Sequence, residues 1–148
     1  MDMEQMSTEL LRFMESLPRR APQNWLGEFS RGEVFLLSYL HSNGGTAIPG
    51  KMSEAMQTST ARIAAALNSL ERKGWITREP SEDDRRQKLV HLTQAGADHI
   101  KLYRDNALKN ITKLLIELGE KDALEYLRIT QRMVSIARNF KIDALQGQ

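Results

Sequence analysis

Two acids and two arginines stand side by side in the middle of the chain, at Asp83-Asp84-Arg85-Arg86. A guanidinium is planar and always charged, so it suits phosphates, carboxylates and the narrow minor groove of A/T-rich DNA. Asp84 lies two residues before Arg86, on the same side of an extended chain, where its carboxylate could orient Arg86 by a charge-assisted hydrogen bond. Taken alone, such a run is more often a solvated surface cluster. The neighbouring elements must decide between the two interpretations.

A second group of useful side chains lies on a helix predicted just before this loop. Ile63, Leu67 and Leu70 repeat at steps of four and three residues, which predicts one buried stripe, and Gly74 ends the helix. The small, polar and basic outer face that we assign to it consists of Thr58, Arg62, Ala66, Ser69 and Lys73.

These side chains are suited to reading DNA. We favour Arg62 as the base-reading residue, because the bidentate contact between arginine and guanine is the commonest specific pairing. Lys51 and Arg72 are expected to contact phosphates, which position a protein without specifying sequence. The alternative is an ordinary exposed helix face, although small residues such as Ala61 and Ala65 would let the helix approach the groove floor. The candidate DNA contacts are Lys51, Ser59, Thr60, Arg62, Ser69, Lys73, Asp84, Arg85 and Arg86.

The elements around these residues follow an informative order. A helix, a glycine stop and a hairpin are the parts of a winged helix-turn-helix, which puts the helix in a major groove and the hairpin tip at a minor groove. The hairpin is predicted from two strand-like segments, 75–79 and 88–92, with the charged loop Pro80–Gln87 between them. With this hairpin beside it, the charged run is better explained as a DNA contact than as a solvated turn.

The remaining segments are mostly helical. Asn43-Gly44-Gly45 ends one short buried helix, and Thr93 can cap the helix that follows the hairpin. The brief helix 51–57 is expected to turn Met52, Ala55 and Met56 inward. The other predicted elements are an amphipathic first helix from Met3 to Leu17, an edge strand at Thr46-Ala47-Ile48, a long helix through Ile100 and Leu118, and a last helix after Gly119. The expected fold class is mainly α with a small antiparallel β-wing.

Composition excludes several classes of protein. The 148 residues carry 21 basic and 19 acidic side chains, so a net charge of +2 permits DNA binding only through local placement of charge. With no cysteine, disulfide scaffolds and cysteinyl metal sites are excluded. The acids between Met1 and Leu17 argue against a signal peptide, and no apolar run is long enough for a membrane span. We expect a cytoplasmic protein with no membrane partner.

Two segments carry a resemblance to a known family. Asp84-Arg85-Arg86-Gln87-Lys88-Leu89-Val90-His91-Leu92-Thr93 resembles the wing of the MarR family of bacterial transcription regulators, and Leu70-Glu71-Arg72-Lys73-Gly74-Trp75-Ile76 resembles the end of its recognition helix. The resemblance implies a homodimeric winged helix-turn-helix repressor or activator, with Arg86 as the wing arginine that enters the minor groove. Gln57 and Thr58 depart from the pattern, since relatives often have glycine and an apolar residue there.

The ends of the chain are expected to form a dimer. Two recognition helices one DNA turn apart read a palindrome, so the flanking helices are expected to pack against a second copy. We expect one domain over 1–148, with a winged helix-turn-helix unit at 30–93 and dimerisation helices at 1–20 and 94–142. The expected interface residues are Met6, Leu10, Ile111, Leu114, Leu118 and Leu127.

Aromatic and histidine residues raise two further questions. The resemblance implies small aromatic effectors, and a pocket for one could be lined by Trp25, Phe29, Phe35 and Tyr39. We favour the simpler explanation that these rings fill the core, and keep the pocket as a hypothesis. His41, His91 and His99 lack compact ligand spacing, so we expect no metal and no cofactor, although Asp98 precedes His99.

No enzyme is predicted, because the sequence has no glycine-rich phosphate loop, no nucleophile with a histidine partner and no paired carboxylates in an apolar setting. The function expected is a sequence-specific DNA-binding regulator, an effector-responsive repressor that binds a palindromic operator as a homodimer. The alternative is a winged-helix module that binds another protein and no DNA. Steep loss of affinity with salt would distinguish the DNA reader.

Overall fold

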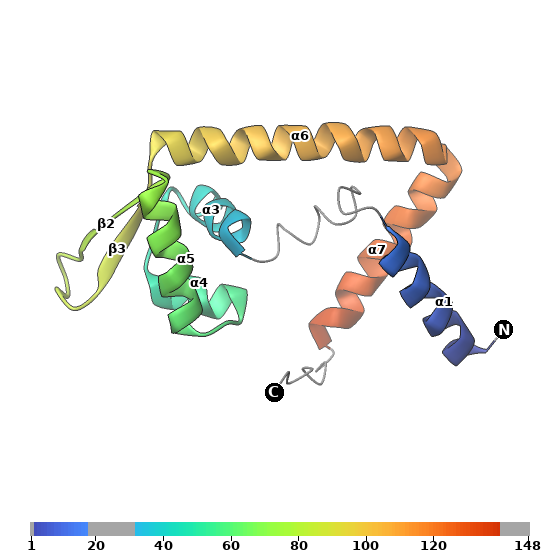
Figure 1. Cartoon of the computed structure of the whole chain (residues 1–148), viewed down its shortest axis with the longest axis horizontal. Helices are drawn as coiled ribbons and strands as arrows, with labels where there is room; N and C mark the ends of the chain where they lie inside the picture. Colours follow the sequence, from blue (N-terminus) through green and yellow to red (C-terminus); the bar gives the residue numbers. More distant parts are fainter. Residues whose placement is uncertain (1, 18–31, 140–148) are drawn as a thin grey trace. The chain divides into compact units, whose positions relative to one another are not determined.

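The computed structural model describes residues 2–17 and 32–139, which form helices and one small antiparallel sheet (Figure 1). The fold class predicted from sequence, mainly α with a β-wing, is confirmed. The chain divides into two compact units, Met1–Leu108 and Lys109–Gln148. The elements are α1 (Met3–Ser16), α3 (Gly32–Ser42), β1 (Thr46–Ala47), α4 (Pro49–Met56), α5 (Thr60–Arg72), β2 (Ile76–Pro80), β3 (Lys88–Leu92), α6 (Gln94–Leu118) and α7 (Glu120–Asn139).

One apolar core holds the central elements together. The predicted stripe of α5, Ile63, Leu67 and Leu70, is buried. It packs in one cluster with residues from α3, α4, the sheet and the start of α6. The other buried members are Leu36, Leu37, Leu40, Met52, Ile76, Val90 and Ile100. This shared core fixes α5 and the hairpin to the same body.

Helix α4 differs in part from the sequence prediction. Met52 is fully buried and Met56 partly, as expected, but Ala55 is exposed, so its assignment to the inward side was wrong. The helix is short, and a burial pattern built on three apolar residues overestimates the width of its buried face. It begins at Pro49, which suits the first helical turn because that position needs no N–H donor.

Two turns place α5. Helix α4 ends at Gln57, which has a left-handed backbone with φ of 52° and is the non-glycine residue with positive φ in the described chain. Ser59 then caps α5, because its side chain accepts a hydrogen bond from the backbone N–H of Arg62 at 3.3 Å. The departure from the family pattern noted at Gln57 thus falls on the residue with the left-handed backbone.

The sheet has the strand order β1-β3-β2, and all its pairs are antiparallel. The predicted edge strand and both hairpin strands are therefore present, although β2 begins at Ile76 and not at Trp75. A polar line crosses the sheet: Thr46 Oγ1 lies 3.1 Å from Nδ1 of His91, and Nε2 of His91 lies 2.6 Å from Oε1 of Glu79. This line ties the base of the hairpin to the edge strand.

The end of the hairpin is joined tightly to α6. The hydroxyl of Thr93 donates to the carbonyl of Gly74 at 2.7 Å and accepts from the N–H of Gly96 at 3.1 Å. Gly96 is buried, and a β-carbon there would overlap the carbonyl oxygen of Trp75 and lie 2.8 Å from Cδ1 of Leu92. The start of α6 therefore packs directly on the turn that ends α5, and Thr93 caps it as predicted.

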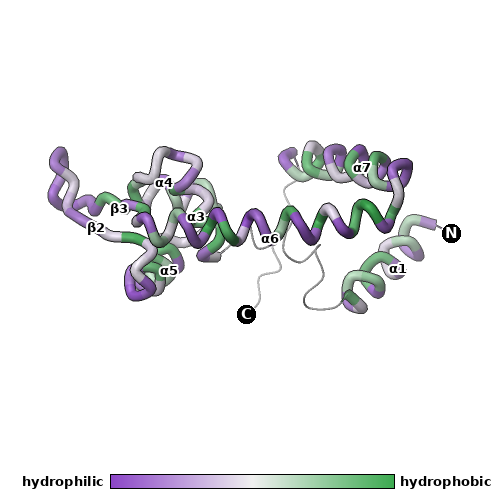
Figure 2. The backbone as a smooth tube through the Cα atoms, turned by 90° about the horizontal axis from the view of Figure 1, so that it is seen from above, coloured by the Kyte–Doolittle hydropathy of each residue, from purple (hydrophilic) through white to green (hydrophobic). Residues whose placement is uncertain are grey.

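Helices α1 and α7 contain no buried residue. Each nevertheless contains large apolar residues at helical spacing. In Figure 2 they correspond to the green bands that alternate with polar ones along both helices. The exposed apolar residues of α7 include Tyr126, Ile129, Met133 and Ile136, and those of α1 include Met3, Met6, Leu10 and Phe13. No helix in the described ranges is long and apolar enough to cross a membrane.

Candidate nucleic-acid interface

Helix α5 presents to solvent a face that includes two alanines. Counting about 100° per residue, the direction opposite the buried stripe falls on Ala61, Ala65, Asn68 and Arg72, all of which are exposed. The outer face assigned from sequence lies to one side of this direction. The outer face was misplaced because it was chosen by the polarity of its residues. Measuring angles around the helix from the centre of the buried stripe would have placed Asn68 on the outer face.

Arg62 lies beside this face near the start of α5. Its side chain is exposed and forms no ion pair with any residue that the structure describes. Ser59 and Thr60 are also exposed, at the N-terminal end where the free N–H groups favour an anion. The three predicted residues therefore gather at one end of the helix, available for a ligand.

Ser69 and Lys73 face a different neighbour. Nζ of Lys73 donates to Oε2 of Glu33 in α3 at 2.5 Å and lies 5.1 Å from the ring centroid of Trp75. Partial burial raises the pKa of Glu33, but hydrogen bonds from Lys73 and Ser69 and the nearby charges of Lys73 and Arg72 outweigh it, so the pKa is lowered overall. Both candidates thus have a partner inside the protein. Sequence gave no sign that α3 occupies this flank.

Asn68 is joined to the hairpin through Arg78. Nη2 of Arg78 donates to Oδ1 of Asn68 at 2.7 Å, and its Nε donates to Oε2 of Glu71 at 2.8 Å. The hydrogen bond and charge of Arg78 lower the pKa of Glu71. Arg78, which is not among the DNA contacts predicted from sequence, links β2 to the exposed face of α5.

The wing tip is exposed and internally ordered. Ser81 N–H donates to the carbonyl of Gln87 at 2.8 Å, and Gln87 N–H donates to that of Asp84 at 2.9 Å, which closes the turn. The predicted bond from Asp84 to Arg86 differs in form: Oδ1 accepts from the main-chain N–H at 2.9 Å, not from the guanidinium. Asp84 thus fixes the backbone of Arg86. The side chains of Arg85 and Arg86 form no ion pair within the described ranges.

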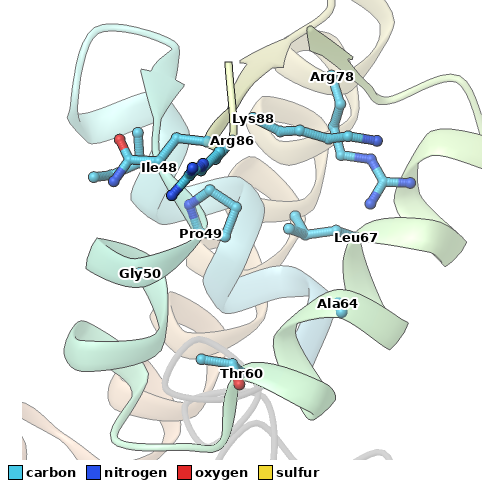
Figure 3. A pocket seen from close by; sticks show the side chains of 10 residues that line it. Ile48, Pro49, Gly50, Thr60, Ala64, Leu67, Arg78, Arg86 and Lys88 are labelled. Carbon is cyan, nitrogen blue, oxygen red and sulfur yellow. The ribbon is translucent and has the colours of Figure 1, made fainter. Parts of the chain in front are cut away.

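A hollow of about 380 Å³ lies between the start of α4, the inner flank of α5 and the wing (Figure 3). Its floor is apolar, and the described residues that line it include three cations and no carboxylate. The lining residues are Ile48, Pro49, Gly50, Thr60, Ala64, Leu67, Arg78, Arg86, Gln87 and Lys88. Lys51 follows Gly50 on α4. Its Nζ lies 3.6 Å from Oε2 of Glu54, one helical turn away, and both side chains are exposed.

The other predicted sites are placed less completely. Trp25 and Phe29 of the effector hypothesis lie outside the described residues, while Phe35 and Tyr39 stack at 6.1 Å between centroids and pack against the core. The ring of His99 stacks on Trp75 at 3.7 Å. In the part of the chain that the structure describes, no three His, Asp or Glu side chains gather as metal ligands would.

The residues predicted at a dimer interface are mostly accessible. Met6, Leu10, Leu118 and Leu127 are exposed, whereas Ile111 and Leu114 are half-buried. All six lie on helices α1, α6 and α7. The exposed members of this group are accessible to a second protein chain.

Comparison with known proteins gives consistent matches. The model of the MarR family matches residues 29–88. YdgG of Bacillus subtilis, described as an uncharacterized HTH-type transcriptional regulator, is 32% identical over 110 residues, which cover 73% of this chain and 71% of YdgG. YpoP of the same organism, described likewise, is 38% identical over 72 residues, covering 47% of this chain and 48% of YpoP. The chain thus spans about half of YpoP.

Solved structures share the fold. The FabT protein of Streptococcus pneumoniae, solved in complex with DNA, has a TM-score of 0.71 at 18% identity and covers 95% of this chain and 100% of its own. YusO of Bacillus subtilis has a TM-score of 0.69 at 18% identity, covering 91% of this chain and 99% of its own. At this identity the likeness establishes the fold alone.

Proposed function

Since this chain belongs to the MarR family, we propose that it is a transcriptional regulator that binds DNA with α5 in a major groove and the tip of the β2–β3 hairpin at an adjacent minor groove. The observation that carries the proposal is the cation-lined hollow between these two probes. In a duplex whose major groove holds α5, one strand must continue from α5 to the wing. The phosphates of that strand would then lie beside this hollow.

The exposed face of α5 suits close approach to bases. Alanines at 61 and 65 have no side chain long enough to hold the helix away from the groove floor, and a methyl group contacts thymine well. Arg62, which has no ion-pair partner in the described chain, keeps its guanidinium available for guanine. We infer that Ser59 and Thr60 bind phosphate at the N-terminus of the helix.

The wing and hollow suit the backbone and the minor groove. Arg78, Arg86 and Lys88 place three positive charges around the hollow, and Arg85 and Arg86 are exposed at the tip. A narrow minor groove attracts arginine because its negative potential is enhanced. We therefore retain Arg86 as the minor-groove contact, with Arg85, Lys51 and Lys88 on phosphates. Ser69 and Lys73, occupied by Glu33, become weaker candidates.

The apolar faces of the terminal helices support a homodimer. Large contiguous apolar surface is unusual on a soluble monomer, and most helix-turn-helix proteins bind palindromes as two-fold dimers. We infer that α1, α7 and the end of α6 form the interface, with 30–93 as the DNA-binding unit and 1–20 and 94–142 as the dimerisation helices. Purified protein should be dimeric at micromolar concentration, and a strict monomer would contradict this inference.

Whether the protein represses or activates transcription is proposed from the name of a relative. MprA of Escherichia coli, 31% identical over 90 residues that span 49% of that protein, is named a transcriptional repressor. We propose repression, relieved by an effector that changes the separation of the two recognition helices. A thermal-shift screen of small aromatic acids tests the effector, and a screen in which no compound moves the transition would remove it.

Duplex binding as a function of salt tests the central proposal. Log affinity should fall linearly with log salt, and Arg86→Ala should reduce the slope by about 1 while weakening binding. Arg104→Ala, at an exposed arginine of α6 that does not line the hollow, is the matched control and should leave both unchanged. Absence of any duplex binding at low salt would favour the protein-interaction module instead.

A further inference from the structure

The bridge between β2 and α5 fixes one exposed amide of the recognition helix. Asn68 lies on the face opposite the core, yet its Oδ1 is held at 2.7 Å by Nη2 of Arg78. Arg78 is itself held by Glu71 through a bond of 2.8 Å from Nε and one of 3.4 Å from Nη2. The side chain of Arg78 is only 19% exposed, so this support is largely shielded from water.

The donor chemistry of arginine determines which way the amide faces. A guanidinium has donors and no acceptor, so the atom of Asn68 that meets it must be the carbonyl oxygen. The NH₂ group of Asn68 is therefore directed away from Arg78. The oxygen has two lone pairs, and Arg78 occupies one of them. Within the described ranges, one acceptor position and two donors of Asn68 therefore remain for a ligand.

We propose, on the basis of the DNA-binding function above, that Asn68 reads an adenine in the major groove and that Arg78 positions it. Adenine presents an acceptor at N7 beside a donor at N6, which matches the amide nitrogen and the free lone pair of the oxygen. Guanine offers two acceptors and no donor there, so it leaves the lone pair of Asn68 unused. Neither residue was assigned a DNA contact from sequence.

Asn68 and Arg62 read separate base pairs. They are six residues apart on α5, which is about 9 Å along a helix. Since successive base pairs are about 3.4 Å apart, one base pair does not serve both. Ala65 lies between them on the helix and leaves space for the intervening base edges. Each half-site should therefore contain a guanine for Arg62 and, a few base pairs away, an adenine for Asn68.

Selection of bound duplexes from a random pool tests the assignment. Wild-type protein should yield a palindrome with an adenine at one position of each half. Asn68→Ala should reduce the preference at that position by roughly five- to tenfold and leave the others unchanged. Asn68→Asp keeps an oxygen for Arg78 but has no donor, so the preference should move towards cytosine, whose N4 is a donor. Gln94→Ala, which removes an exposed carboxamide at the start of α6, is the control.

Arg78→Lys tests the positioning role. Lysine keeps the positive charge but not the planar fork, so the adenine preference should weaken at the same position while the salt slope stays as in wild type. A uniform loss of affinity at all positions in either variant would overturn the proposal and indicate a structural role. An unaltered motif in Asn68→Ala would also overturn it. If wild-type protein selects no motif, the proposed function itself fails.

Discussion

Gln57 gives the sharpest test of the turn that places α5. Its backbone φ of 52° is the left-handed conformation, which costs an L residue about 1–2 kcal/mol because the β-carbon approaches a carbonyl oxygen. Glycine has no such cost, although its extra freedom in the unfolded chain costs about 0.5–1 kcal/mol. The side chain of Gln57 is exposed, so little contact is lost. Gln57→Gly should stabilise the fold by about 0.5–1 kcal/mol.

Chemical denaturation followed by far-ultraviolet circular dichroism measures this change in the free energy of unfolding. Thermal unfolding should show a rise in Tm of about 2–4 °C per kcal/mol for a chain of this size. Gln57→Ala is the control, because alanine keeps the strained β-carbon and should shift stability by less than about 0.5 kcal/mol. If the glycine variant is less stable than wild type, the left-handed turn at the end of α4 is refuted. The glycine variant should also keep its duplex affinity, since α5 keeps its position.

Three further outcomes are expected. Gly96→Ala should destabilise the fold by about 2–3 kcal/mol through overlap with the Trp75 carbonyl, whereas Gly50→Ala, with open space around it, should not; urea titration distinguishes them. Glu33→Gln should be less stable than wild type at neutral pH, by up to about 1 kcal/mol. Because the pKa of Glu33 is lowered from 4.5, this difference should be complete above pH 4.5 and vanish as pH falls through the folded-state pKa; a difference that persists in acid would contradict the ion pair. Asp84→Ala should weaken duplex binding several-fold with Tm nearly unchanged, while Asp84→Asn, which keeps the acceptor oxygen, should bind nearly as wild type does.

Most elements of the fold were predictable from patterns among neighbouring residues. The repeat of Ile63, Leu67 and Leu70 located the buried side of α5, and glycine at 74 located its end, because burial periodicity and left-handed turns are properties of neighbouring residues. The hairpin was found for the same reason, with its first strand beginning one residue later than expected.

Contacts between residues far apart in the sequence could not be predicted from the sequence. Nothing near Ser69 or Lys73 in the sequence indicates that Glu33 would occupy them from α3. The hydrogen bond from Arg78 to Asn68 likewise depends on the packing of β2 against α5. The DNA-contact role assigned to Arg62 therefore stays a prediction at an exposed position, whereas Ser69 and Lys73 are weaker candidates because α3 packs beside them.

The joint at Thr93 has a mechanical consequence. One hydroxyl connects the last turn of α5, through Gly74, to the first turn of α6, through Gly96, and the close approach at Gly96 leaves no slack between them. Because these bonds join the start of α6 to the turn that follows α5, we expect a rotation of the first turn of α6 to move the end of α5 with it. Under the proposed function, a small tilt at the start of α6 should therefore change the direction in which α5 meets DNA.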